Sequence, residues 1–173
     1  MSGPDHSRRQ AVTDAIERRL DREAGYGYRL MALIAVVVVV VDQLTKMVVR
    51  TAIPMGDTVD VVPGIQLVNT VNTGIAFGLF PGSQTAVAAL TLIAIGVIGV
   101  LLVGFAGHHA LVPIGGGLLL GGSIGNLIDR IGRDGVTDFI AIGPWPQFNV
   151  ADIGVTVGAL LLVLALVFSS GHD

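Results

Sequence analysis

Four long apolar stretches, separated by shorter polar segments, dominate the chain. They cover residues 30–49, 85–105, 111–128 and 150–168. A helix rises about 1.5 Å per residue, so about 20 apolar residues cross a bilayer core about 30 Å thick. The pattern therefore predicts an all-α membrane protein in which four transmembrane helices form one compact bundle.

The polar segments between the stretches predict one further element. Residues 58–62 and 65–71 are rich in Val and Ile, and Pro63-Gly64 is typical of a turn between two strands. We expect a small extracytoplasmic β-element here, within an outer segment of about residues 50–84. The segment ends on Asn72, whose amide can bond to a neighbour, and on Gly74, which permits a tight backbone. A plain loop explains these last residues equally well.

The third stretch carries many glycines, and Gly121 and Gly125 form a GxxxG pair. Small residues let helices approach closely in lipid, where packing drives association. Close helix packing is the meaning we assign to them. Asn126, Asp129 and Arg130 then bring polar groups to the end of the same helix.

Composition agrees with a membrane location. The 173 residues are 52% hydrophobic and 13% charged, with a mean hydropathy of +0.77, which is too apolar for a soluble domain of this length. Zero cysteines exclude disulfides, thiol nucleophiles and Cys metal sites. The four histidines, His6, His108, His109 and His172, fall in the tails or the inner turn. We expect no metal, no cofactor and no nucleic-acid partner.

Charge predicts the orientation. Six of the ten Lys and Arg residues precede the first apolar stretch: Arg8, Arg9, Arg18, Arg19, Arg22 and Arg29. The positive-inside rule then predicts a cytoplasmic tail over 1–29, a four-span domain over 30–168 and a cytoplasmic tail over 169–173. The outer side would hold residues 50–84 and an outer loop over 131–149. Arg50, Arg130 and Arg133 fall on that side and weaken the bias.

The N-terminal tail has a pattern of its own. Residues 1–10 are predicted to be disordered. In residues 11–23, Val12, Ile16 and Leu20 recur at four-residue spacing among charged residues, which is typical of a short helix on the inner membrane surface. A solvated tail with chance spacing explains the pattern equally well.

Two aspartates are the main candidates for chemistry. Asp138 lies in the outer loop and Asp152 in the first turn of the fourth span, so both belong to one membrane face. Neither has a basic residue within three positions, and carboxylates at the edge of hydrocarbon are costly. Two carboxyls that share one proton can hydrolyse a peptide bond. The alternatives are an acid in a helix cap begun by Asn149, for Asp152, and a solvated loop acid, for Asp138.

Two other charged groups indicate structure rather than chemistry. Asp42 and Lys46 have the spacing of an ion pair on one helix face. Asp129 and Arg130 are expected to form an ion-pair network with Asn126.

These residues form part of a larger set of segments that resembles a known family. In chain order the segments are Asp42-x-x-x-Lys46, Asn72-Thr73-Gly74-Ile75-Ala76-Phe77-Gly78, Gly121-Gly122-Ser123-Ile124-Gly125-Asn126-Leu127-Ile128-Asp129-Arg130, Val136-Thr137-Asp138-Phe139-Ile140 and Phe148-Asn149-Val150-Ala151-Asp152. Together, over about residues 30–168, they closely resemble lipoprotein signal peptidase, the bacterial type II signal peptidase. Ser123 stands where that family often has alanine.

The resemblance implies an aspartic endopeptidase of the bacterial inner membrane. Such an enzyme removes the signal peptide from prolipoproteins and cuts before a diacylglyceryl-modified cysteine. The partners it implies are these prolipoproteins and membrane lipid, and we expect a monomer. It makes Asp138 and Asp152 the catalytic pair. The remaining matches are residues that bind the substrate backbone or order the site (Asn72, Asn126, Arg130 and Asn149) and supporting residues (Asp42, Lys46, Gly74 and Asp129).

Two other classes of function remain open from the residues alone. A small ion-coupled transporter could use the membrane acids as a proton relay, but its acids would more often lie at mid-bilayer on broken helices. A non-catalytic membrane scaffold would leave the two aspartates without a role.

Overall fold

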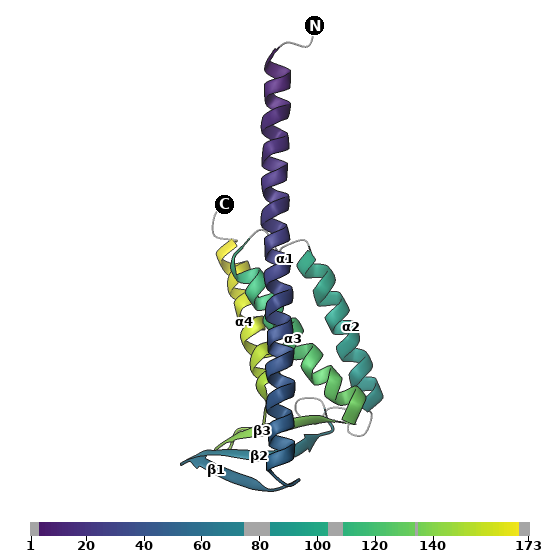
Figure 1. Ribbon diagram of the computed structural model, residues 1–173, viewed down its shortest axis with the longest axis vertical. Helices are drawn as coiled ribbons and strands as arrows, with labels where there is room; N and C mark the ends of the chain where they lie inside the picture. The colour runs from purple at the N-terminus through teal and green to yellow at the C-terminus, as the bar shows by residue number, and fades with distance from the viewer. Residues whose placement is uncertain (1–3, 75–83, 104–108, 134, 170–173) are drawn as a thin grey trace.

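Four helices and a three-stranded sheet make up the computed structural model, which describes residues 4–74, 84–103, 109–133 and 135–169 (Figure 1). The helices are α1 (Pro4–Ala52), α2 (Gln84–Val103), α3 (Leu111–Arg133) and α4 (Val150–Ser169). The strands are β1 (Thr58–Val62), β2 (Ile65–Asn72) and β3 (Val136–Ile142). The sheet lies at one end of the helices, and the first turns of α1 lie far beyond the other end (Figure 1).

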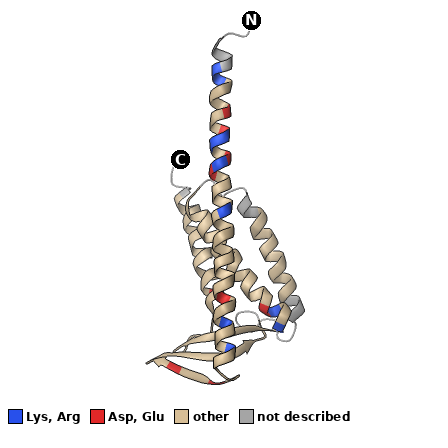
Figure 2. Cartoon of the chain, in the orientation of Figure 1, with Lys and Arg blue, Asp and Glu red and all other residues tan. Residues whose placement is uncertain are grey.

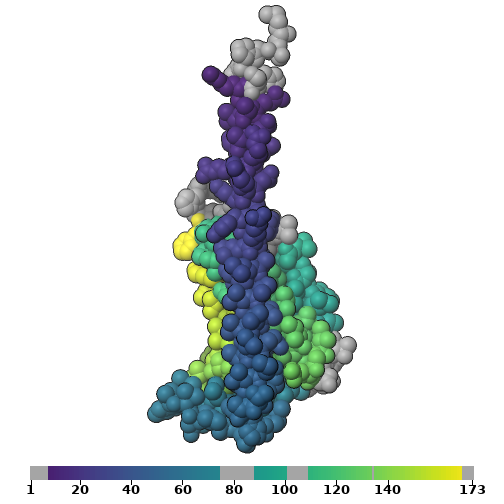
Figure 3. All heavy atoms as spheres, in the orientation of Figure 1, coloured from purple at the N-terminus to yellow at the C-terminus, as the bar shows by residue number. Residues whose placement is uncertain are grey.

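Helix α1 is much longer than the sequence predicted. The expected disorder is wrong for residues 4–10, and so is the separate helix over 11–23, because one helix runs without a break from Pro4 to Ala52. Residues 1–3 lie outside the described part of the chain. Proline is well suited to the first helical position. The Arg19–Glu23 ion pair at 3.0 Å, one helical turn apart, stabilises the polar N-terminal part of α1. The polar part stands clear of the other helices (Figure 3), and charged residues gather along it (Figure 2).

Apolar helices of membrane-spanning length account for most of the bundle. Among the described residues, three segments are long and apolar enough to cross a membrane: Arg8–Ala52, Leu111–Arg133 and Val150–Phe168. The expected span in α2 contributes a shorter apolar helix, Ala88–Val100, and its predicted end at residue 105 lies outside the described residues. Helix α4 begins at Val150 as predicted. Helix α3 continues past the predicted residue 128 to Arg133.

Helix α3 is the centre of the bundle and packs against α1, α2 and α4. Its glycines permit this. A Cβ atom on Gly121 would lie 2.7 Å from the carbonyl oxygen of Ala35 in α1, and one on Gly115 would lie 2.9 Å from that of Gly158 in α4. Real Cβ atoms do not approach backbone so closely. The predicted role of these glycines in close packing is therefore confirmed.

The sheet is antiparallel with the order β1-β2-β3, and the two predicted strands and the turn at Pro63-Gly64 are confirmed. The third strand was not predicted. Asp138 was expected in a loop, but it lies on β3 opposite Thr70 of β2. The packing of Phe139 with Val49 and Ile53 near the end of α1 holds the sheet against the bundle. The side-chain amide of Asn69 adds a hydrogen bond of 2.7 Å to the carbonyl of Ile53.

Candidate active site

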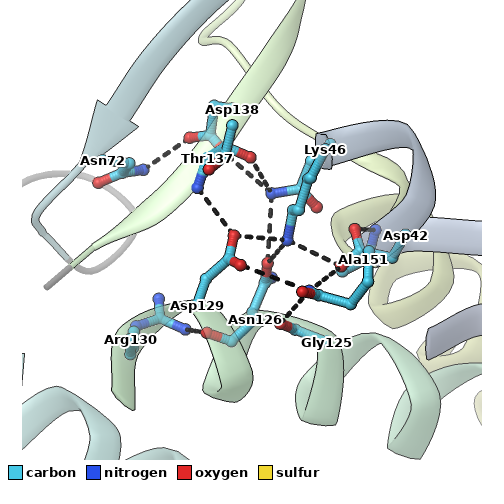
Figure 4. A network of polar contacts seen from close by, with 12 residues as sticks. Asp42, Lys46, Asn72, Gly125, Asn126, Asp129, Arg130, Thr137, Asp138 and Ala151 are labelled. Atoms are coloured by element: carbon cyan, nitrogen blue, oxygen red, sulfur yellow. Dashed lines mark hydrogen bonds and ion pairs between the residues drawn. The ribbon is translucent and has the colours of Figure 1, made fainter. Parts of the chain in front are cut away.

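A buried polar cluster lies where α1, α3 and α4 meet strands β2 and β3 (Figure 4). Its side chains come from all five elements and from Asn149, the residue that precedes α4. The most deeply buried polar and charged members are Asp42, Lys46, Asn126, Asp129, Thr137, Asp138 and Asn149. The structure therefore brings together residues that are far apart in the sequence, at the end of the bundle that carries the sheet.

Asp138 is held by two amide donors from different elements. The side-chain amide of Asn149 donates to Oδ1 at 2.7 Å, and that of Asn72 donates to Oδ2 at 3.0 Å. Asn72 is itself oriented by Gly74, whose backbone N–H donates to its Oδ1 at 3.0 Å. The remaining residues of that motif, 75–78, lie outside the described part of the chain. Asp138 is only 4% exposed.

Asp152 lies in the first turn of α4 and is partly exposed. Its backbone N–H donates to Oδ1 of Asn149 at 3.0 Å, and the N–H of Asn149 donates back to Oδ2 of Asp152 at 3.1 Å. This reciprocal pair is the arrangement of a capping box. The helix-cap interpretation of Asp152 is therefore confirmed. The same carboxylate also accepts a bond of 2.8 Å from Asn126, so the cap does not remove it from the cluster.

The environment of Asp138 makes its carboxyl a weaker acid than an ordinary aspartate. Burial is the main cause that raises the pKa of Asp138 from 3.8 to about 6. The negative charge of Asp152 acts in the same direction, which reflects how near the two carboxyls lie. The hydrogen bonds from Asn72 and Asn149 and the charge of Lys46 act in the opposite direction. The two aspartates thus differ in environment, because Asp138 is buried and Asp152 is partly exposed.

Lys46 is a fully buried cation within the same cluster. Its Nζ lies 2.9 Å from Asp42 and 3.3 Å from Asp129, and it donates to Oδ1 of Asn126 at 3.0 Å. The expected Asp42–Lys46 pair is confirmed, and it belongs to a larger network. Asp42 also accepts a bond of 3.0 Å from the backbone N–H of Ala151. The network therefore joins α1 to both α3 and α4.

The expected pairing of Asp129 with Arg130 is wrong. Asp129 instead faces Lys46 and Arg50, the latter at 3.7 Å. Adjacent residues on a helix point in different directions, so the partner comes from another helix. Arg130 donates to the backbone oxygen of Asn126 at 3.4 Å, and its Nε is buried without a hydrogen-bond partner.

Three members of the cluster were not predicted. Gln43 donates to Asp42 at 3.1 Å and to the carbonyl of Gly125 at 3.1 Å. Arg50 donates to the hydroxyl of Thr137 at 3.0 Å. A signal was available for Arg50, because it follows Lys46 at the same four-residue spacing that separates Lys46 from Asp42. For the hydroxyl of Thr137 no such local signal exists.

Within the described ranges, no group of three or more His, Cys, Asp or Glu side chains is arranged to hold a metal ion. The chemistry that these described residues support is acid and base catalysis by two carboxyls. Asparagine amides orient them, and a buried cation partly offsets their charge.

Comparisons with known proteins agree over most of the chain. The family model described as signal peptidase (SPase) II matches residues 34–168. A lipoprotein signal peptidase of Shouchella clausii is 36% identical over 143 residues, which are 82% of this chain and 95% of that protein. One from Symbiobacterium thermophilum is 40% identical over 144 residues, which are 80% and 94% of the two chains.

Solved structures resemble the fold as well. A bacterial membrane enzyme determined by the in meso method at 2.3 Å resolution has a TM-score of 0.77 and 32% sequence identity, and the match covers 83% of this chain and 90% of that one. A second bacterial membrane enzyme, at 1.9 Å resolution, has a TM-score of 0.67 and 34% identity, and the match covers 79% and 91% of the two chains.

Proposed function

The chain belongs to the signal peptidase II family, whose activity is the removal of signal peptides from prolipoproteins, and we propose that Asp138 and Asp152 perform this hydrolysis. The observation that carries the proposal is the pair of carboxyls joined through Asn126 and Asn149. The family assignment does not support the alternative of an ion-coupled transporter.

The two carboxyls take different roles in the proposed reaction. Asp138, whose pKa is raised, holds the proton and donates a hydrogen bond to the carbonyl oxygen of the scissile peptide. Asp152 acts as the base and takes a proton from water as the water oxygen bonds to the carbonyl carbon. The C–N bond then breaks, and a proton from the pair passes to the leaving nitrogen. No group other than the two carboxyls and water enters this balance.

The surrounding residues orient the pair and receive the substrate. Asn126 and Asn149 each direct an amide at one of the carboxyls, which fixes the spacing of the two acids. Arg130 has a buried donor, Nε, that is left for a carbonyl of the substrate backbone. Asn72 borders the other side of Asp138 and is held in turn by the backbone N–H of Gly74. A buried ion-pair network supports these residues, and its members are Asp42, Lys46 and Asp129.

We place the enzyme in the bacterial inner membrane with four spans and with both termini in the cytoplasm. The six arginines before the first span support this orientation. They lie at the opposite end of the molecule from the sheet (Figure 2), so the site faces outward, in the headgroup region. The sheet is then extracytoplasmic. We further propose that the enzyme acts as a monomer, since one chain supplies every member of the polar cluster.

A site at this depth needs a substrate that is held there. The signal-peptide helix supplies one anchor, and a diacylglyceryl group on the following cysteine supplies a second, at about 0.8 kcal/mol per buried CH₂. The apolar surface of the bundle offers both a place to bind. We therefore propose that the substrate is the lipid-modified prolipoprotein and that the cut falls just before the modified cysteine.

The test compares two forms of one prolipoprotein peptide, with and without the diacylglyceryl group, at matched concentration in detergent micelles. The lipid-modified form should be cut before its cysteine, and the unmodified form should be cut far more slowly. Cleavage of both at one rate would show that the lipid is not recognised. If neither form were cut, the assigned activity would be contradicted. Asp138→Asn protein serves as the control for contaminating proteases.

A further inference from the structure

Thr137, the residue before Asp138, has all three of its polar groups held by other elements. Its N–H donates to Oδ2 of Asp129 at 3.0 Å, its hydroxyl accepts from Nη1 of Arg50 at 3.0 Å, and its carbonyl accepts from Asn149 at 3.3 Å. These partners belong to α3, to α1 and to the residue preceding α4. Thr137 is 1% exposed. One residue of β3 is thus tied to three helix ends at once.

Because Thr137 precedes Asp138 on the strand, these bonds influence the orientation of the Asp138 carboxyl. Successive side chains of a strand point to opposite faces, so Arg50, which holds the Thr137 hydroxyl, acts on the face opposite the Asp138 carboxyl. Fixing that face limits rotation of the strand about its own axis. Such a rotation would move the Asp138 carboxyl relative to Asp152.

The sheet holds this part of β3 from one side, because Thr137 pairs with Val71 and Asp138 pairs with Thr70 of β2. The register of β2 against β3 shifts between Leu67 and Thr70, and Thr70 is the partner of Asp138. Such an irregularity leaves part of the ladder without regular pairing and bends the strand. Bonds from outside the sheet therefore add to a ladder that is regular on only one side of Asp138.

Arg50 is the member of this arrangement to which the proposed function assigns no role. It lies in the last turn of α1, with a side chain only 16% exposed, beside the fully buried Asp129. A guanidinium that donates to a hydroxyl makes a charge-assisted bond, which is stronger and better directed than a neutral one. Arg50 also approaches Asp129, which holds the N–H of the same threonine.

We propose that Arg50 and the hydroxyl of Thr137 act as positioning residues for the reaction by holding β3 so that the Asp138 carboxyl stays aligned with Asp152. The proposal rests on the assignment of Asp138 as a catalytic residue. Neither side chain touches the substrate. Their loss should therefore lower kcat and leave KM nearly unchanged.

The test begins with two changes at one position. Thr137→Val keeps the shape but removes the hydroxyl, whereas Thr137→Ser keeps the hydroxyl. We expect kcat to fall on the order of tenfold in the first, because small misplacements of reacting groups are costly, and to stay within about twofold in the second. KM should change less than about twofold in both. Thr51→Val is the matched control, because Thr51 is exposed and its hydroxyl bonds only to backbone oxygens of its own helix.

Arg50→Gln completes a double-mutant cycle. If the two side chains act through one contact, the double variant with Thr137→Val should be no slower than the slower single variant. Losses that multiply would overturn the proposal, as would an unchanged kcat in Thr137→Val or an equal loss in Thr137→Ser. If Thr137→Val fails to fold, Arg50→Gln decides alone, and a kcat within twofold of the unmodified enzyme overturns the proposal.

The same assay includes Asp138→Asn to separate this proposal from the one on which it rests. Turnover by Asp138→Asn would remove the catalytic assignment itself. An inactive Asp138→Asn beside a fully active Thr137→Val would leave the catalytic assignment in place and reject only the positioning role.

Discussion

Asn149 donates its side-chain amide to the side-chain oxygen of Asn126 at 3.2 Å, and each of these residues also donates to one aspartate. Asn126 bonds to Asp152 at 2.8 Å, and Asn149 bonds to Asp138 at 2.7 Å. The two carboxyls are therefore connected through amides rather than through a charged side chain. An amide bridge keeps two acids near each other without neutralising either one, which leaves them able to share a proton.

The first prediction concerns the two acids. Asp138→Asn and Asp152→Asn should each lower kcat at least about a hundredfold, because an amide keeps the volume but cannot exchange the proton. The double variant should be little worse than either single one, since the pair acts as a unit. Turnover of a purified precursor measures this. Thermal unfolding in detergent checks that each variant is folded, and near-normal turnover in a folded single variant would contradict the assignment.

A second prediction follows from the raised pKa of Asp138. Because that pKa is about 6 in the fold against an ordinary 3.8, the folded chain binds more protons than the unfolded one between these values. This contribution to stability is fully present below about pH 4 and is lost as the pH rises through about 6. At about 1.4 kcal/mol per pKa unit, the loss is about 3 kcal/mol. The midpoint of thermal unfolding should fall over this range more steeply in the unmodified protein than in Asp138→Asn, and parallel trends would refute the expectation.

The third prediction tests the packing of α3. Gly121→Ala should lower the free energy of unfolding by about 1–3 kcal/mol, because the added Cβ would lie 2.7 Å from the carbonyl oxygen of Ala35 and 2.8 Å from Cβ of Val38. Gly132→Ala on the same helix is the matched control, since nothing lies within 4 Å of its added Cβ. The control should be neutral or slightly stabilising. Equal effects of the two changes would mean that close packing is not what Gly121 provides.

A fourth prediction concerns the buried cation. Lys46→Met should cost about 3–5 kcal/mol, because it leaves the buried Asp42 without its ion-pair partner and leaves Asp129 with only Arg50, at 3.7 Å. Arg19→Met removes one partner of an ion pair too, but that pair is exposed, so little change is expected. Chemical or thermal unfolding in detergent compares the two. A Lys46→Met protein as stable as the Arg19→Met control would show that Lys46 does not hold the network together.

The last prediction is that chelation leaves activity intact. The proposed reaction uses only two carboxyls and water, and the chain has no cysteine to bind a soft metal. Turnover should be the same before and after extended treatment with EDTA. Loss of turnover that a divalent cation restores would favour a metal-bound water over the carboxyl pair.

Local patterns were enough to predict the helices and part of the site. The apolar run after Asn149 and the spacing from Asn149 to Asp152 predicted where α4 begins, because both signals lie within one helical turn of the boundary. The Asp42–Lys46 pair was predictable for the same reason. In contrast, the short segment from Val136 to Ile142 becomes a strand by pairing with β2, far away in the sequence, so Asp138 was expected in a loop.

Long-range partners also explain the remaining differences. The bond from Arg50 to Thr137 joins residues 87 positions apart, and no pattern within one segment of the sequence predicts it. Asp129 was expected to pair with its neighbour Arg130, but the bundle offers it Lys46 and Arg50 from α1. The length of α1 was underestimated for a different reason. The four-residue spacing ended at residue 23 and the apolar run began at residue 30, so two helices were expected where one runs without a break.

The bond between the Ala151 N–H and Asp42 spans 109 positions, and this separation has a consequence for synthesis. Asp42 and Lys46 leave the ribosome early, and they can neutralise each other at once because both lie on one helix. Asn149, Ala151 and Asp152 emerge last, as α4 begins. Until that helix is inserted, Asp138 lacks the amide of Asn149 and the second carboxyl. The polar cluster is therefore completed only when α4, the last helix to be made, joins the other three in the membrane.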